Sequence, residues 1–420
     1  MSSESMPAST SSSPEEGHVR RTPLVRMLRA LLALGLGLVL AFGAGEAGFR
    51  YLLFSDSGLA LKYGAKFRDA NVFSNSKAHS DYFKLRFLWR EAVGKNQGFH
   101  NTDPRLGWVK AQVQRPDLDH QHRTRVGKRR PFLMYGDSFT ACTTRQKDCW
   151  EGLVESSFLG PHVCVINYGV RGYGVDQMKV LLDETIDLWK DQDPVVAVGI
   201  LADDDLDRVV FEFREGPKPY FDLEGGTLVP TYPGEYQDLA SWIDEHPPEV
   251  TSYLLRYLTV GARLLPESFA GEHFPEGEEL VRRKKTLSAS LITSMRDRLE
   301  EAGVDYFFII FEGPFVRRGE KFVSKQTWRL QFLKLVLDEL EIPWVSSTRA
   351  VLEHQREHGR KGNAGYFVPD GKPDARHFTP LGNQAALNSI LRGLHGSFDG
   401  EIRELERHPR RPSRVSADGQ

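Results

Sequence analysis

Two short motifs, far apart in the chain, carry side chains that together could perform acyl transfer. The first is Gly-Asp-Ser at residues 136–138, directly after the apolar run 131–135. The second is Asp-Ala-Arg-His at residues 374–377, just before a segment with helical periodicity. A serine hydroxyl needs a general base to become a nucleophile, and the base needs a carboxylate that fixes its tautomer. The motifs therefore predict Ser138 as nucleophile, His377 as base and Asp374 as the group that orients the base.

Each motif taken alone has an ordinary structural explanation. A serine in such a turn is common at the start of a helix, where its side chain caps the backbone. A histidine just before a helix is equally common on a protein surface. The position of Ser138 adds weight, because ligand sites in open α/β sheets lie at the carboxyl ends of the strands.

The elements that must position these residues alternate between strand and helix. Short apolar runs predict buried strands, and stretches with helical periodicity predict helices between them. This alternation favours an α/β domain with a mostly parallel sheet. The glycines at 225 and 226 predict a hairpin over residues 218–230. The predicted strands are 131–135, 163–167, 195–201, 306–311 and 343–345, and the predicted helices are 150–158, 175–190, 238–264, 278–303, 326–340 and 379–394.

The motifs, in this order, resemble the four sequence blocks of the SGNH hydrolases, also called GDSL lipases or esterases. The serine and histidine blocks are residues 136–138 and 374–377, the glycine block resembles residues 167–172, and the third block corresponds to residues 203–206. The resemblance covers residues 130–395 and is closest to a membrane-anchored bacterial branch. It implies a flavodoxin-like three-layer α/β/α sandwich with a mostly parallel five-stranded sheet, and an acyl-enzyme formed on Ser138.

The resemblance also implies which groups bind the oxyanion of the tetrahedral intermediate. Two of them are the N–H groups of Ser138 and Gly172. The third is normally an asparagine side chain, but the aligned residue here is Asp204. A carboxyl group donates a hydrogen bond only when it is protonated, and the loss of one oxyanion donor typically costs about 3–4 kcal/mol. We therefore expect weak activity that the change Asp204→Asn improves. The alternatives are an Asp204 that is held protonated, for which the change would be near neutral, and a donor that comes from another residue.

An apolar stretch near the N-terminus predicts a membrane anchor. Residues 30–45 carry no charge, and four arginines lie between residues 20 and 29. This basic flank predicts a cytoplasmic N-terminus and an exported C-terminal part. A cleaved signal peptide and a buried helix of a soluble protein are the alternatives. The predicted organisation is a disordered cytoplasmic tail (1–23), a transmembrane anchor (24–49), a membrane-proximal lead-in (50–130), the hydrolase-like domain (131–396) and a disordered tail (397–420).

Composition excludes several other classes of protein. The net charge of −2 offers no general attraction to nucleic acid, and three cysteines are too few for a disulfide scaffold. Cys142 and Cys149 are predicted to form one small disulfide, the alternative being three free buried thiols. The string from His354 to His358 matches an inverted zinc-peptidase motif, but its charged surroundings favour a solvated helix. We expect no metal and no cofactor.

Together, these observations predict a membrane-anchored, extracytoplasmic serine esterase that acts on small acyl esters. Acetyl groups on cell-surface carbohydrate fit the predicted location and the family resemblance. Transfer of the acyl group to a sugar hydroxyl is the alternative among enzymes, since both reactions share one acyl-enzyme. A cell-surface binding protein that keeps the fold without activity is the alternative of another class, because of Asp204.

Overall fold

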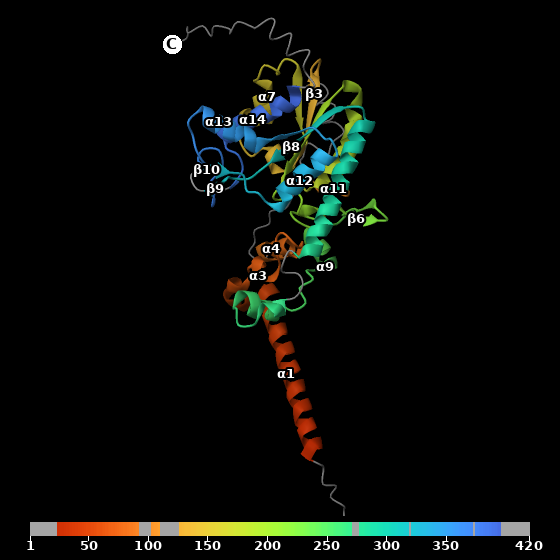
Figure 1. Cartoon of the computed structure of the whole chain (residues 1–420). Coiled ribbons are helices and arrows are strands. Elements are labelled where there is room, and N and C mark those ends of the chain that lie inside the picture. Colours follow the sequence, from red (N-terminus) through yellow and green to blue (C-terminus); the bar gives the residue numbers. More distant parts are fainter. Residues whose placement is uncertain are drawn as a thin grey trace, which may run out of the picture.

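The computed structural model describes residues 23–91, 102–109, 126–270, 277–318, 321–372 and 374–395. Almost all of the two predicted tails lies outside these residues, as does most of the predicted lead-in after residue 91. In the described part, a long helix leads into a small group of helices, and an α/β sandwich lies beyond them (Figure 1).

Five parallel strands form the central sheet, in the order β11-β8-β5-β3-β4. Strands of a parallel sheet that are covered on both faces are apolar along their whole length, and β5 is buried at every position. For this reason the predicted strands match the observed ones to within one or two residues. The observed bounds are β3 (Arg130–Gly136), β4 (Val163–Asn167), β5 (Val195–Leu201), β8 (Asp305–Phe311) and β11 (Trp344–Ser346).

Helices cover both faces of this sheet and complete a three-layer sandwich (Figure 1). Each helix turns an apolar stripe toward the strands, as a surface helix of an α/β protein must. The predicted fold class is confirmed. One face packs against α8 (Val175–Thr185), α11 (Glu278–Glu301) and α12 (Trp328–Glu339), and the other against α7 (Trp150–Glu155), α13 (Ser347–Glu357) and α14 (Pro380–His395).

The segment predicted as one helix over 238–264 is broken, which corrects that prediction. Pro247 and Pro248 lie in its middle, and proline lacks the N–H that a helix interior needs. The pieces are α9 (Leu239–Glu245), α10 (Tyr253–Arg256) and a π-helical turn over Tyr257–Gly261. They pack beside the N-terminal helices and not on the sheet.

The N-terminal helix α1 (Pro23–Phe54) joins this group at its C-terminal end. Phe49 and Leu53 are buried in an aromatic cluster with Phe73, Trp89 and Tyr253. The end of α1 and the helices that follow it therefore share one core with the segment inserted at 239–270. We call this group the helical subdomain (residues 46–91 and 239–270). Its N-terminal helices are α2 (Gly58–Gly64), α3 (Ala70–Phe73) and α4 (Asp81–Glu91).

The part of α1 before the helical subdomain is apolar and uncovered. The segment Met27–Phe54 is long and apolar enough to cross a membrane, and none of its most apolar window is buried. The alternative of a buried helix in a soluble protein is therefore wrong for the described residues. A membrane span and a signal sequence both remain consistent with this helix.

Among the described residues, three short antiparallel strand pairs lie outside the central sheet. The pair β6 (Tyr220–Glu224) and β7 (Thr227–Thr231) confirms the hairpin predicted over residues 218–230. The short pair β1 (Thr102–Asp103) and β2 (Gly107–Trp108) belongs to the lead-in and packs against the sandwich core through Leu106 and Trp108. A third pair, β9 (Val316–Arg318) and β10 (Lys321–Val323), follows β8.

Candidate active site

Ser138 lies at the carboxyl end of β3, as the first residue of the short helix α6 (Ser138–Ala141). The Asp137 carboxylate caps this helix by accepting a hydrogen bond from the Phe139 N–H at 2.8 Å. Gly136 has no space for a side chain, because an added Cβ would lie 2.6 Å from a carbonyl oxygen of β5. This tight turn presents Ser138 at the edge of the sheet while leaving it only 8% exposed.

His377 reaches Ser138 from the loop before α14. Its Nε2 lies 2.7 Å from the Ser138 Oγ, although 239 residues separate the two in the chain. Its ring stacks on the Phe139 ring, with 5.1 Å between the ring centroids, and backbone hydrogen bonds pair its loop with Val368. A histidine at this distance can accept the serine proton, so the pair has the geometry of a nucleophile and its base.

The Asp374 carboxylate does not hold His377, which corrects the predicted triad. It contacts the Arg171 guanidinium at 2.5 Å, whereas the main-chain carbonyl of Asp374 faces His377 Nδ1 at 3.0 Å. Two causes are visible: Asp374 has a φ of +57°, and the neighbouring cation attracts its carboxylate. A carbonyl oxygen accepts a hydrogen bond from Nδ1–H and so selects the tautomer in which Nε2 is the base.

Gly172 lies on the loop after β4 with a φ of +86°, a conformation that favours glycine. The loop is joined to the serine turn by a hydrogen bond from the Val170 N–H to the Gly136 carbonyl at 3.0 Å. The Trp108 indole N–H donates to the Arg171 carbonyl at 2.9 Å. The lead-in therefore positions the predicted oxyanion glycine, a role that the sequence motifs did not reveal.

Arg214 packs directly against Gly172, and sequence reasoning missed it. A Cβ added to Gly172 would lie only 2.5 Å from the Nη1 of Arg214. Burial, assisted by the positive charge of Arg208, lowers the pKa of Arg214 to about 10, which still leaves it a cation at neutral pH. Its guanidinium carbon lies 5.6 Å from the centroid of the Phe83 ring, and the carboxylates of Glu215, Asp204 and Asp205 favour its charged form. This half-buried cation beside Gly172 can supply positive potential to an anion that forms there.

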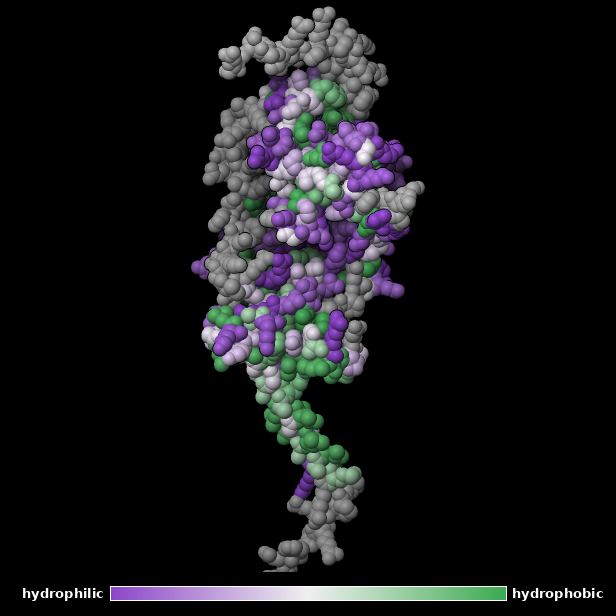
Figure 2. Space-filling model, turned by 90° about the vertical axis from the view of Figure 1, so that its left-hand side faces the viewer, coloured by the Kyte–Doolittle hydropathy of each residue, from purple (hydrophilic) through white to green (hydrophobic). Residues whose placement is uncertain are grey.

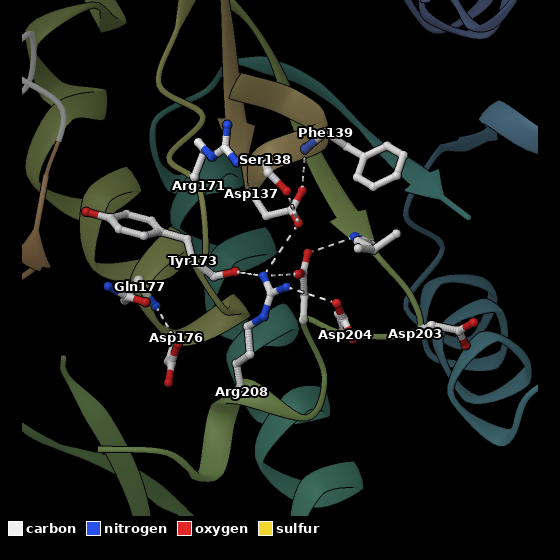
Figure 3. A network of polar contacts seen from close by, with 12 residues as sticks. Asp137, Ser138, Phe139, Arg171, Tyr173, Asp176, Gln177, Asp203, Asp204 and Arg208 are labelled. Carbon is white, nitrogen blue, oxygen red and sulfur yellow. Dashed lines mark hydrogen bonds and ion pairs between the residues drawn. The ribbon is translucent and has the colours of Figure 1, made fainter. Parts of the chain in front are cut away.

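A second buried arginine, Arg208, connects the serine turn with the third block (Figure 3). Its guanidinium donates to the Tyr173 carbonyl and to the Asp205 carboxylate, both at 2.6 Å. It also lies 3.4 Å from the Asp137 carboxylate, which caps the helix of Ser138. Burial alone would lower the pKa of Arg208, but the surrounding carboxylates outweigh burial and raise it, so this arginine is charged.

Asp204, at the place of the expected asparagine, is a carboxylate that pairs with Arg208 at 3.3 Å. Partial burial opposes its ionisation, but the positive charges of Arg208, Arg214 and Lys77 prevail and lower the pKa of Asp204. It is therefore ionised at neutral pH and cannot donate a hydrogen bond. A donor role for Asp204 in the oxyanion hole would need the protonated form, which the neighbouring cations disfavour.

The neighbouring acidic residues have partners of their own. Asp203 accepts a hydrogen bond from the Thr327 hydroxyl at 2.5 Å. Asp207 is paired with Lys284 and with Arg329, each at 2.7 Å. The acidic run after β5 is therefore distributed over separate contacts from later parts of the chain, and it is not one exposed acidic patch.

The predicted disulfide between Cys142 and Cys149 is confirmed, and Cys164 is a free, buried thiol. The disulfide closes the loop that follows the helix of Ser138. Asn383, near the start of α14, donates to the Thr144 hydroxyl at 3.0 Å within this loop. The loop after the nucleophile is therefore tied to the helix that follows His377, which stiffens that side of the site.

The zinc-peptidase string is part of the packing of α13. The rings of His354 and His358 stack on each other with 4.0 Å between centroids, and His354 Nδ1 lies 3.0 Å from the Tyr366 hydroxyl. Within the described ranges, no group of three or more His, Cys, Asp or Glu side chains is arranged to hold a metal ion.

Comparison with known proteins finds similarity at the level of structure. No protein-family model and no curated protein matches the chain. Among solved structures, a catalytic mutant of an acetylxylan esterase from Geobacillus stearothermophilus matches with 13% identity and a TM-score of 0.33, over 63% of this chain and 94% of that one. A member of the lipolytic protein G-D-S-L family from Veillonella parvula matches with 11% identity and a TM-score of 0.29, over 62% of this chain and 96% of that one.

Proposed function

We propose that this protein is a serine esterase of the SGNH type, with Ser138 as nucleophile and His377 as general base. The observation that carries the proposal is the 2.7 Å separation between Ser138 Oγ and His377 Nε2 at the carboxyl edge of the sheet. The His377 tautomer required for this role is supported by the Asp374 carbonyl on Nδ1. This pair supplies the nucleophile and the base for acyl transfer through a covalent intermediate.

In the proposed reaction, Ser138 Oγ attacks the carbonyl carbon of the ester while His377 Nε2 takes the hydroxyl proton. The tetrahedral intermediate collapses as His377 gives that proton to the departing alkoxide, and the acyl group remains on Ser138. A water molecule, deprotonated by His377, then attacks the acyl-enzyme. The second collapse releases the carboxylic acid and returns the proton to Ser138.

The oxyanion is stabilised by the N–H groups of Ser138 and Gly172 and by the charge of Arg214. N–H groups in the first turn of a helix have no partner within that helix, which suits the N–H of Ser138 to this task. Arg214 lies against Gly172 and supplies positive potential on the side where the family pattern has an asparagine amide. The same cation also compensates the ionised Asp204.

We further propose that the domain lies outside the cytoplasm and is held at the membrane by α1. The exposed apolar surface of α1 supports a membrane span, and the basic residues before it support a cytoplasmic N-terminus. The disulfide between Cys142 and Cys149 agrees with an oxidising compartment. In such a location the substrate is a small acyl ester, with acetylated surface carbohydrate as the proposed class.

The proposal is tested with a fluorophosphonate probe on the full chain in detergent or lipid nanodiscs. We expect a covalent adduct on Ser138 that is lost in Ser138→Ala and retained in Ser156→Ala, a matched change at an exposed serine at the end of α7. Hydrolysis of p-nitrophenyl acetate should follow the same pattern. A chain that folds, binds acetylated oligosaccharide and gives neither adduct nor hydrolysis would be a binding protein instead. Product formed on an added sugar would identify transfer over hydrolysis.

A further inference from the structure

The helical subdomain carries an exposed apolar surface around the upper end of α1. Outside α1, nine large apolar side chains of the described residues are exposed, and five of these belong to the subdomain. Isolated exposed apolar residues are ordinary, whereas a concentration of them indicates an interaction surface. We call these five the collar: Leu59, Leu61, Tyr63, Leu264 and Phe269.

The collar residues come from two distant segments that meet beside α1. The α2 segment is in close contact with α1, because a Cβ added to Gly64 would lie only 1.9 Å from the Leu52 carbonyl oxygen. The second segment contacts α1 closer to its N-terminus, where Leu254 lies 3.1 Å from a Cβ added to Gly45. The Glu46 carboxylate also accepts the Leu254 N–H at 2.8 Å. Both segments lie at the base of the globular part, next to the exposed stretch of α1 (Figure 1).

The length of the exposed stretch matches a bilayer. From Met27 to Gly45, at about 1.5 Å per residue, α1 extends over roughly 28 Å, close to the ~30 Å of a hydrocarbon core. The first contact with the helical subdomain therefore occurs at the depth where a membrane surface would lie. Figure 2 shows hydrophobic residues along α1 continuing into the base of the globular part, where they mix with hydrophilic ones.

Basic side chains accompany the collar. Lys62 lies over the Tyr63 ring at 5.1 Å, and Lys66 lies over the Phe67 ring at 4.8 Å. Both lysines and Arg263 are exposed. Aromatic rings combined with lysine and arginine are typical of the boundary between lipid headgroups and acyl chains.

We propose that the collar inserts into the outer interface of the same bilayer that α1 crosses, so that the domain rests on the membrane and is not only tethered to it. This inference relies on the anchor proposed above and adds a second, lipid-facing surface to it. The occupant is the lipid interface, because the collar continues the apolar surface of α1 and carries matching cations.

The consequence for the enzyme is a fixed position of the active site. The helical subdomain packs against the loops that follow β5: Lys77 Nζ donates to the Asp203 carbonyl at 3.1 Å, and the Phe83 and Phe211 rings lie 5.5 Å apart. These loops belong to the same sheet edge as Ser138. A docked collar therefore holds the catalytic edge toward the membrane, where it meets ester groups presented close to the lipid surface.

The test uses single introduced cysteines labelled with bimane in the full chain, at one chain per nanodisc. The native cysteines do not compete, since two are bonded to each other and Cys164 is buried. Leu264→Cys and Phe269→Cys report on the collar and Leu36→Cys on the middle of α1. Leu335→Cys, on α12 and as exposed as Phe269, is the matched control. Lipids with a doxyl group near the headgroup quench a label that lies at the interface.

We expect about twofold quenching of the two collar labels, as for side chains buried 5–10 Å into the interface, and none of the label at Leu335. If deeper doxyl lipids quench the label at Leu36 while the collar labels stay unquenched, the collar proposal is overturned and the anchor stands. If the label at Leu36 is also unquenched, both fail. Hydrolysis measured on the same discs reports on the esterase separately.

A double variant separates lost lipid contact from local unfolding caused by the label. Leu264→Asp combined with Phe269→Asp should weaken lipid contact of the collar, measured as reduced quenching of a label at Leu61→Cys. The control Leu335→Asp should leave the quenching of that label unchanged. One chain per disc excludes burial of the collar by a second copy. Collar labels that are shielded only in discs holding two chains would show that the surface joins copies of the protein, and this outcome would contradict the lipid proposal.

Discussion

The two halves of the candidate active site are built in different ways. The first half is a direct contact between two side chains, Ser138 and His377, carried by two loops. The second half surrounds Gly172: the buried Arg208 pairs there with carboxylates and backbone groups, while the half-buried Arg214 packs against Gly172. Short motifs revealed the first half, while the second half contains a residue, Asp204, that departs from the family pattern.

The difference follows from what each half must do. A nucleophile and its base need two particular atoms at hydrogen-bond distance, so their residue types are restricted. An oxyanion needs positive potential at one place, which an N–H, an amide or a guanidinium can supply. A carboxylate at position 204 is therefore tolerable where a cation stands beside it. Changes in the first half should abolish activity, and changes in the second half should slow it.

The largest effect is expected at the two contacting side chains. Ser138→Ala and His377→Ala should each lower kcat for p-nitrophenyl acetate by about 10⁴-fold or more. The reason is that the nucleophile and its base act together, so the loss of either one removes the contribution of both. The double variant should be hardly worse than either single one. Ser156→Ala should match the wild type. Activity of Ser138→Ala within tenfold of the wild type would mean that another group is the nucleophile.

The next effect is expected at Arg214. Arg214→Gln should lower kcat by about 10²–10³, the usual cost of removing one oxyanion-stabilising group, with little change in KM. Arg214→Lys keeps the charge and should recover part of the loss. In the Asp204→Asn background the loss should be smaller, because the carboxylate that Arg214 compensates is gone. Equal losses in both backgrounds would show that the two residues act independently, and an unchanged kcat would remove Arg214 from the mechanism.

A smaller effect is expected at Asp374, although the family pattern makes it a member of the triad. Its carboxylate pairs with Arg171 and its carbonyl faces His377. Asp374→Asn keeps that carbonyl and should lower kcat by less than about tenfold, since it removes a partly exposed ion pair. Arg171→Gln should have a similar effect. A 10⁴-fold loss in Asp374→Asn alone would show that the carboxylate turns to His377 during catalysis.

The smallest effect concerns stability and pH. The pKa of Asp204 is lowered in the folded protein by neighbouring cations, so its charge stabilises the fold above the unfolded pKa of about 4 and loses this effect as pH falls through the lowered value. The side chain is half exposed, so we expect under about 1 kcal/mol. The Tm of Asp204→Asn should lie slightly below that of the wild type at pH 7 and approach it as the pH falls through the lowered pKa of Asp204. A variant with the higher Tm at pH 7 would contradict this sign.

Much of the fold was predictable because its main elements are local patterns. Strands β4 and β5 were expected at the residues where they occur, since a strand buried on both faces is apolar throughout. The broken helix at 238–264 shows where local patterns fail. Its apolar periodicity continues across Pro247 and Pro248, and only the tertiary contacts show that the pieces belong to a separate subdomain. The α10 piece contacts Phe49 and Phe73, and α9 contacts Phe83 and Phe87.

For the candidate active site, the sequence by itself pointed to Ser138, His377 and the glycine loop, through their motifs and, for Ser138 and the glycine loop, through their places directly after strands. The tertiary structure alone decided which way Asp374 turns its carboxylate and which cations surround Asp204. Such contacts join residues from separate loops, as the 203 residues between Arg171 and Asp374 show. They depend on backbone conformations such as the positive φ of Asp374 and on burial, and neither is written in a local pattern of residue types.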